Sequence, residues 1–334
     1  MQNRGADPKA VRLWYKLNQN TKIRVKTGSG ISQYTDVGAV LGQGTLAGAL
    51  ISQAVLDDGV MSHFPPGGNL QLEYGSVKLA PAMYQDDLAD CSGNLANARE
   101  SNRKVNILVK QRCLDLNRDK TVFILIGSKQ QKEEVRRELR NNPLMCGQFQ
   151  MKEETVSKYL GQYISSEGLA ASVTETVKNR DGKIRGASLE IATIVNDWRS
   201  HLAGGMMTAV TMWEKCCVPS LLHGAGTWVE ITPATVKQLN ATQQWYWRLI
   251  YQVGPGAPLC SLLWDQTCLD MGVRVMEQKV LLALHLRHLD EESLANQVYQ
   301  EQLAMGWPGL ARPSCSLQGQ PFRVGCKWGG PWQY

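Results

Sequence analysis

Four apolar residues recur at seven-residue steps in the second half of the chain, and this spacing constrains the possible folds more than any other feature. Val177, Ile184, Ile191 and Trp198 would lie along one face of a single long helix. An apolar stripe of that length must be buried against other elements. The sequence therefore predicts that the residues beyond about 165 form a mostly helical unit.

Other segments of the second half also have helical patterning. They are residues 232–252 and 269–305, and Ser172 with Glu175 matches a capping box that would begin the long helix. Six of the ten tryptophans lie between positions 198 and 264. Tryptophans at helical spacing are more typical of a core than of a base-stacking platform. Residues 306–334 hold six glycines and four prolines without periodicity, so we expect a loose tail there.

The first half alternates between strand and helix patterns. Residues 22–35 predict a hairpin with a basic outer face, and residues 70–83 are extended and apolar. A helix is expected from about Leu95 to Cys113. The five apolar residues of 122–126 are typical of a strand that is covered on both faces. Together with the helical second half, this pattern predicts an α+β fold that divides near residue 165.

Composition narrows the class of protein. With 334 residues, 43% of them hydrophobic and 20% charged, the chain is long enough for two domains and is not of a disordered or fibrous type. No apolar run reaches the length of a membrane helix. Nine cysteines, an odd number without a CxxC pair, favour a reducing compartment. We therefore expect an intracellular protein with no membrane partner, either nuclear or cytoplasmic.

The positive charge is concentrated in one segment. Residues 99–140 contain twelve Lys or Arg against six Asp or Glu, a surplus that equals the +6 net charge of the whole chain. Glutamates at helical spacing among the arginines of 129–140 favour a solvated helix face. A surface that faces a polyanion is the alternative.

Four short motifs follow one another along the chain. They are Gln43-Gly44 before a helix, Tyr84-Gln85-Asp86-Asp87 at a strand end, Asn117 to Thr121 with Lys120 entering a strand, and Tyr159-Leu160-Gly161 in a later strand. In this order and spacing they resemble the palm of reverse transcriptases, most closely those of non-LTR retrotransposons. Weaker signatures at 218–224 and 226–228 resemble the region beyond. The resemblance implies a partial palm over residues 1–165, a helical thumb and connection over 166–305, and the tail.

The resemblance also implies roles for individual residues. Asp86 and Asp87 would hold two Mg²⁺ (or Mn²⁺) ions that promote nucleotidyl transfer to a primer 3′ end. Lys120 would lie near the leaving pyrophosphate, where a lysine can donate a proton. Contacts to the deoxynucleoside triphosphate and the RNA or DNA template would come from Gln43 and Gly44, and contacts to the primer from Tyr84, Tyr159, Leu160 and Gly161.

Two departures from the family pattern affect the expected activity. The Ser-Pro that usually follows the Gln-Gly is replaced by Ala47-Gly48. The first motif, a strand with a further metal-binding aspartate, should precede the helix that begins at Asp7-Pro8, and only six residues stand before it. We therefore expect an N-terminally truncated enzyme that is inactive alone. The alternatives are a non-catalytic nucleic-acid-binding remnant and a helical scaffold without a nucleic-acid partner.

Overall fold

The chain forms two compact units in the computed structural model. The structure describes residues 7–9, 12–13, 16, 21–24, 26–27, 30–37, 60–65, 68, 70–79, 81–84, 87–112, 114–199, 205–256 and 269–305. Unit 1 comprises residues 1–123 and 129–152, and unit 2 comprises residues 124–128 and 153–334. Both helices and strands occur, so the mixed α and β character that the sequence predicts is confirmed.

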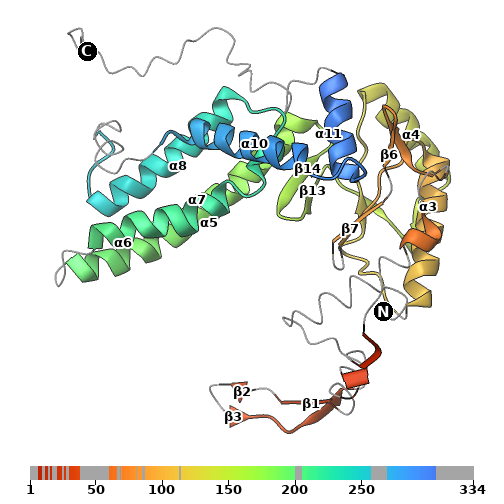
Figure 1. Cartoon of the computed structure of the whole chain (residues 1–334), viewed down its shortest axis with the longest axis horizontal. Coiled ribbons are helices and arrows are strands. Elements are labelled where there is room, and N and C mark those ends of the chain that lie inside the picture. Colours follow the sequence, from red (N-terminus) through yellow and green to blue (C-terminus); the bar gives the residue numbers. More distant parts are fainter. Residues whose placement is uncertain are drawn as a thin grey trace. The chain divides into compact units, whose positions relative to one another are not determined.

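Unit 1 combines short antiparallel hairpins with helices, and α3 and α4 are the helices whose full bounds are described (Figure 1). Its elements are β1 (Thr21–Ile23), β2 (Lys26–Thr27), β3 (Gly30–Ile31), β4 (Thr35–Val37), β5 (Leu72–Tyr74), β6 (Val77–Leu79), β7 (Ala82–Tyr84), β8 (Asp87–Ala89), α3 (Leu95–Gln111), β9 (Val122–Phe123), α4 (Lys129–Asn141), β10 (Met145–Cys146), β11 (Phe149–Gln150) and β12 (Lys152–Glu153). Within the described residues every sheet has two strands, with β1 on β4, β2 on β3, β5 on β6, β7 on β8, β9 on β12 and β10 on β11. No wider sheet of a palm type is part of the described structure.

Two strand predictions in unit 1 need correction. The apolar run 122–126 is wrong as a strand covered on both faces: only Val122–Phe123 is extended, it has a single partner strand, and Ile126 is 72% exposed. The extended stretch 70–83 is broken into three short strands, because Gly75 adopts φ +60° in the turn between β5 and β6. In the first segment Phe123 packs against a buried cluster, and in the second segment Leu70 and Met83 pack against the cluster that includes Val105 and Leu108 of helix α3.

Helix α3 organises the core of unit 1. It begins where the Asn94 side chain accepts a hydrogen bond from the amide of Asn97 at 2.8 Å. Val105 and Leu108 on its inner face are buried with Phe64, and Met83 and Leu88 of the β7–β8 hairpin pack against this cluster. The hairpin that carries the predicted acidic motif is therefore held by its apolar side.

Unit 2 is one short hairpin followed by helices (Figure 1). Its elements are β13 (Val156–Tyr159), β14 (Gln162–Ser165), α5 (Leu169–Arg199), α6 (Gly205–Met212), the π-helix η2 (Trp213–Cys217), α7 (Val218–Leu221), the 3₁₀-helix η3 (Ala225–Thr227), α8 (Pro233–Tyr251), α10 (Met271–Arg287) and α11 (Leu294–Ala304). Beyond Ser165 the described residues contain no strand. The prediction of a helical second half is thus confirmed.

The start of the long helix differs from the predicted capping box. Helix α5 begins at Leu169, which places Ser172 inside its first turn. The Ser172 hydroxyl donates to the carbonyl oxygen of Gly168 at 2.8 Å and accepts from the amide of Ser165 at 2.9 Å. The capping box is wrong because this serine is used to join α5 to β14.

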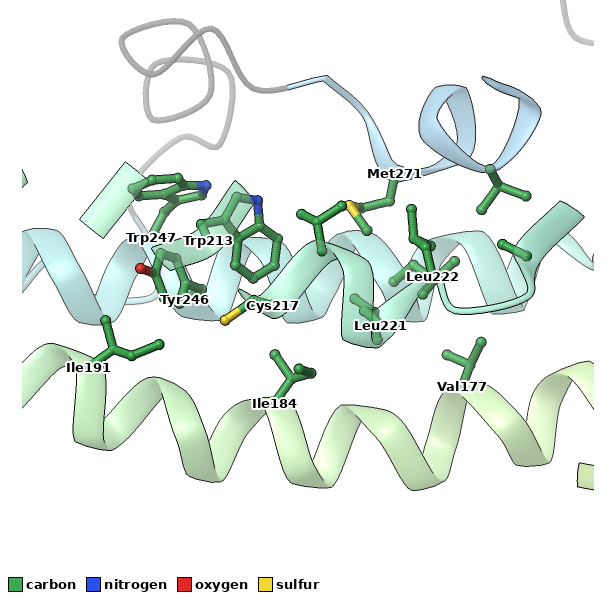
Figure 2. Packing of buried hydrophobic residues seen from close by; sticks show 14 of the residues in the cluster. Val177, Ile184, Ile191, Trp213, Cys217, Leu221, Leu222, Tyr246, Trp247 and Met271 are labelled. Atoms are coloured by element: carbon green, nitrogen blue, oxygen red, sulfur yellow. The ribbon is translucent and has the colours of Figure 1, made fainter. Parts of the chain in front are cut away.

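The core of unit 2 lies between α5, α8 and the α6–η2–α7 segment. Val177, Ile184 and Ile191 are buried along one face of α5 and point toward the other helices, as Figure 2 shows. Opposite them, the rings of Trp213 and Tyr246 lie 4.7 Å apart between centroids. The seven-residue repeat is confirmed for these three positions, while the side chain of its fourth member, at 198, lies outside the described residues.

Candidate nucleic-acid and metal site

The predicted acidic motif lies at the end of a two-stranded antiparallel hairpin. Tyr84 of β7 pairs with Asp87 of β8, and Met83 pairs with Leu88. Neighbouring residues of a strand point to opposite faces, so Met83 and Leu88 reach the core while Tyr84 is 57% exposed and Asp87 is exposed. Residues 85 and 86, which connect the two strands, lie outside the described residues.

The described acids do not by themselves make a metal site. No group of three or more His, Cys, Asp or Glu side chains that could hold a metal ion occurs in the part of the chain that the structure describes. A Mg²⁺ ion can complete its octahedron with water and substrate phosphates, yet two ions need carboxylates placed on both sides. Asp87 supplies one carboxylate, and Asp86 lies outside the described residues.

Two other predicted site residues belong to unit 1. Lys120 is exposed at the end of a turn in which the Asn117 side chain accepts hydrogen bonds from the amides of Asp119 and Lys120, at 3.0 and 3.1 Å. Such an Asx turn explains why the chain reverses just before β9. The predicted template-side motif, Gln43-Gly44, lies outside the described residues.

The predicted primer-side motif forms a tight turn in unit 2. Tyr159 of β13 pairs with Gln162 of β14, and the two residues between them have positive φ, +47° at Leu160 and +80° at Gly161. Positive φ at both central positions is the geometry of a type I′ hairpin turn. Leucine rarely adopts such a φ. Leu160 is also 38% exposed, so the turn presents an apolar side chain on a strained backbone.

Arg180 of α5 holds this turn against the loop that follows α7. The guanidinium Nη2 donates to the carbonyl oxygen of Gly161 at 2.7 Å. Nη1 donates to the carbonyl oxygens of Leu221 and His223, at 3.1 and 2.6 Å. The guanidinium also lies 5.9 Å from the centre of the Trp228 ring. One buried side chain thus joins two segments that are about sixty residues apart in sequence.

Gln162 and Gly224 complete the same contact. The Gln162 amide donates to the carbonyl oxygen of His223 at 2.7 Å and accepts from the indole N–H of Trp228 at 3.0 Å. Gly224 has φ +68°, and a Cβ at this position would collide with the Gln162 amide. Position 224 therefore needs a glycine. We call this group of residues the turn-locking cluster; it consists of Gly161, Gln162, Arg180, Leu221, His223, Gly224 and Trp228.

Sequence reasoning singled out most of this cluster's backbone but missed its central cation. The turn motif and the weaker signatures at 218–224 and 226–228 cover the acceptors, the glycine and the tryptophan. Arg180 carried no motif. A usable signal was the spacing of Ser172, Thr176 and Arg180, three hydrogen-bonding side chains at four-residue steps on one helix face.

The basic segment 99–140 runs through α3, β9 and α4, and ion pairs form both within and between the two helices. Arg99 lies 2.7 Å from Glu138, and Arg140 lies 3.0 Å from Glu133. A further pair joins Arg103 to Glu100 at 2.6 Å. These pairs favour the solvated helix face over a dedicated polyanion surface, although exposed pairs of this kind add little stability.

The predicted site residues are divided between the two units. Tyr84, Asp87 and Lys120 belong to unit 1, whereas Tyr159, Leu160 and Gly161 belong to unit 2.

Within the described residues, no helix is long and apolar enough to cross a bilayer. No protein-family model matches the chain, and comparisons with curated proteins and with solved structures found no match.

Proposed function

We propose that the chain is part of a retroelement RNA-directed DNA polymerase. In this proposal residues 1–165 contribute a partial palm, residues 166–305 a thumb and connection, and the substrates are a primed RNA or DNA template and deoxynucleoside triphosphates. Mg²⁺ or Mn²⁺ would be held by Asp86 and Asp87 together with a further acid, which the family pattern places on an earlier strand. The proposal rests on the motif resemblance, and the hairpin geometry supports it.

The observation that carries the proposal is the Tyr84–Asp87 pairing. The strand pair puts Asp87 at the first position of β8, opposite Tyr84, and the apolar side of the hairpin is fixed on α3. An acid pair in a flexible, fully solvated loop would need no such anchoring. Tyr84 is exposed next to the pair, as a residue that contacts a primer end should be.

The turn of Tyr159–Gln162 supports the same proposal from unit 2. Leu160 and Gly161 lie at the tip of this turn, and hydrogen bonds from Arg180 and Gln162 hold the turn in place. The role proposed for this turn is to grip the primer strand.

A primer-extension assay tests the proposal. The chain as given should extend a primer on an RNA template poorly or not at all, with Mg²⁺ or Mn²⁺ present. Supplying an upstream segment that contains a strand with one aspartate should restore extension, because a third carboxylate can then face the acid pair.

The chain offers a matched control for this assay. The double variant Asp86→Ala with Asp87→Ala should abolish the restored extension, whereas Asp57→Ala with Asp58→Ala, which changes the other Asp-Asp pair, should not. Equal loss in both double variants, or extension that survives the change at 86 and 87, would contradict the proposed roles.

A non-catalytic nucleic-acid-binding protein is the second candidate. It is supported by the primer-side turn, which Arg180 and Gln162 hold in place and which would serve nucleic-acid binding without a metal site. This candidate predicts salt-dependent primer–template binding by the chain and no extension after the upstream segment is added. The same assay therefore separates the two candidates.

A further inference from the structure

A row of side chains on α5 runs along the free edge of β14. The hydroxyl of Ser172 accepts from the amide of Ser165 at 2.9 Å, and the hydroxyl of Thr176 accepts from the amide of Tyr163 at 2.9 Å. Arg180 then donates to the carbonyl oxygen of Gly161. From one contact to the next, the residue number on α5 increases by four and the residue number of its partner on the hairpin decreases by two.

These steps match in length. Four residues of helix rise about 6 Å, and two residues of strand span roughly 6.6 Å, so successive side chains of α5 meet successive backbone groups of β14. A two-stranded hairpin is marginal on its own and leaves its outer backbone groups unpaired. The row on α5 provides partners that a third strand would otherwise supply.

Arg180 differs from the other two members because it holds the tip of the hairpin. Its guanidinium is buried and donates to three carbonyl oxygens, and no carboxylate forms an ion pair with it in the described part of the chain. Burial lowers the pKa of Arg180, because the charged form loses hydration that the carbonyl oxygens replace only in part. A buried cation without an ion-pair partner carries a desolvation cost that its hydrogen bonds must offset.

We propose that Arg180 is a positioning residue that fixes the Tyr159–Gln162 turn to the Leu221–Gly224 segment, so that the turn keeps one orientation relative to the helices of unit 2. The planar fork of an arginine reaches acceptors on both segments at once, whereas a lysine ammonium is a single point donor. The strained Leu160 depends on this support. The consequence for primer binding rests on the proposed function, but the positioning itself does not.

Arg185 offers a matched control on the same helix. It lies 5.4 Å from the centre of the Trp245 ring, and its Nε donates to Asp181 at 2.7 Å, but it makes no contact with the turn. The variants Arg180→Met and Arg185→Met therefore each remove one positive charge and one cation–π contact from α5. They differ in whether the turn loses its anchor.

Hydrogen–deuterium exchange of the full chain tests the positioning role. In Arg180→Met, the peptide spanning 158–164 should exchange about 10- to 100-fold faster, the loss expected for one charge-assisted hydrogen bond. In Arg185→Met its exchange should stay unchanged. Equal exchange of this peptide in both variants would overturn the proposal.

If Arg180→Met speeds exchange throughout unit 2, the variant Arg180→Lys tests the positioning role instead. Arg180→Lys keeps the charge but cannot span both segments, so faster exchange should be confined to 158–164 and 221–228. Exchange in Arg180→Lys that matches wild type in these peptides would overturn the proposal.

Primer–template affinity, measured by fluorescence anisotropy on the same proteins, separates this inference from the proposed function. We expect weaker binding in Arg180→Met and wild-type binding in Arg185→Met. If the turn is released and affinity does not change, the positioning role stands and the proposed primer role of the turn fails.

Discussion

Residues 184 and 194 are both isoleucines of α5, and they allow a controlled test of how this helix is packed. Ile184 is 6% exposed and faces the core of unit 2, whereas Ile194 is 41% exposed. Changing Ile184 to alanine removes three buried carbons, worth about 2.4 kcal/mol of transfer free energy, and leaves a cavity that raises the loss to roughly 3 to 4 kcal/mol.

The same change at Ile194 should cost much less. Part of its surface is already in water, and alanine has the better helix propensity, so the free energy of unfolding should fall by about 1 kcal/mol or less. For a unit of this size, each kcal/mol shifts the midpoint temperature by roughly 2 to 4 °C. Ile184→Ala should therefore lower the melting temperature by about 6 to 16 °C and Ile194→Ala by no more than about 4 °C.

Tryptophan fluorescence during thermal unfolding is a suitable assay. Nine of the ten tryptophans lie between residues 153 and 334, so the signal reports mainly on unit 2. Equal destabilisation by the two variants, or a larger effect at Ile194, would refute the assignment of the buried face of α5.

Three further predictions concern the turn-locking cluster, a buried thiol and nucleic-acid binding. In a urea titration, Gly224→Ala should lower the free energy of unfolding by at least about 1 to 2 kcal/mol, because φ at this position is +68° and the Gln162 amide occupies the place of the Cβ. The control Gly182→Ala, in an open stretch of α5, should raise the free energy of unfolding by about 0.5 to 1 kcal/mol. Burial, with a smaller contribution from the adjacent thiol, raises the pKa of Cys217 to about 11, so the free energy of unfolding should fall between pH 9 and pH 11, as the unfolded thiol ionises first, by up to roughly 3 kcal/mol. Cys217→Ala should flatten this loss, and identical pH profiles of the two proteins would contradict the prediction. Primer–template affinity should fall with added salt irrespective of base sequence, each neutralised phosphate adding roughly 0.7 to 0.9 to the logarithmic slope; an affinity that stays constant from low to moderate salt would exclude this electrostatic mode.

The helical half of the fold was predictable because one periodic pattern fixes it. Val177, Ile184 and Ile191 needed a partner face, and the partner helices carry their own periodicity and capping signals, such as Thr232 before Pro233. The exact start of α5 was not predictable. Ser172 has the residue type of a cap, but its hydroxyl accepts from the amide of Ser165 in the preceding strand, a contact that helix periodicity does not indicate.

The strands of unit 1 were harder to predict because short apolar runs have more than one solution. Within the run at 122–126, Phe123 packs against the cluster of Leu144, Cys146 and Met151, whereas Ile126 is exposed, and the run has no second partner strand in the described structure. Extended character was therefore recognisable, but the number of neighbouring strands was not.

The candidate site was partly predictable. A Tyr-x-Asp-Asp sequence after an apolar strand indicates a turn, and Tyr84 and Asp87 do pair across a hairpin. Arg180 could not be found in this way, because its acceptors are backbone carbonyls, which any residue can provide. Only the folded arrangement brings Gly161 and His223 to the same guanidinium.

Site-specific photo-cross-linking on the chain as given tests most directly whether the protein holds a primer. A photoreactive residue is placed at Leu160, which is exposed on the turn, and in a second protein at Leu189, which is 54% exposed on α5. With a labelled primer–template, we expect a cross-link from position 160 to the primer strand near its 3′ end and little or none from position 189. Equal cross-linking from both positions, or cross-links to nucleic acid that avoid the primer end, would contradict it.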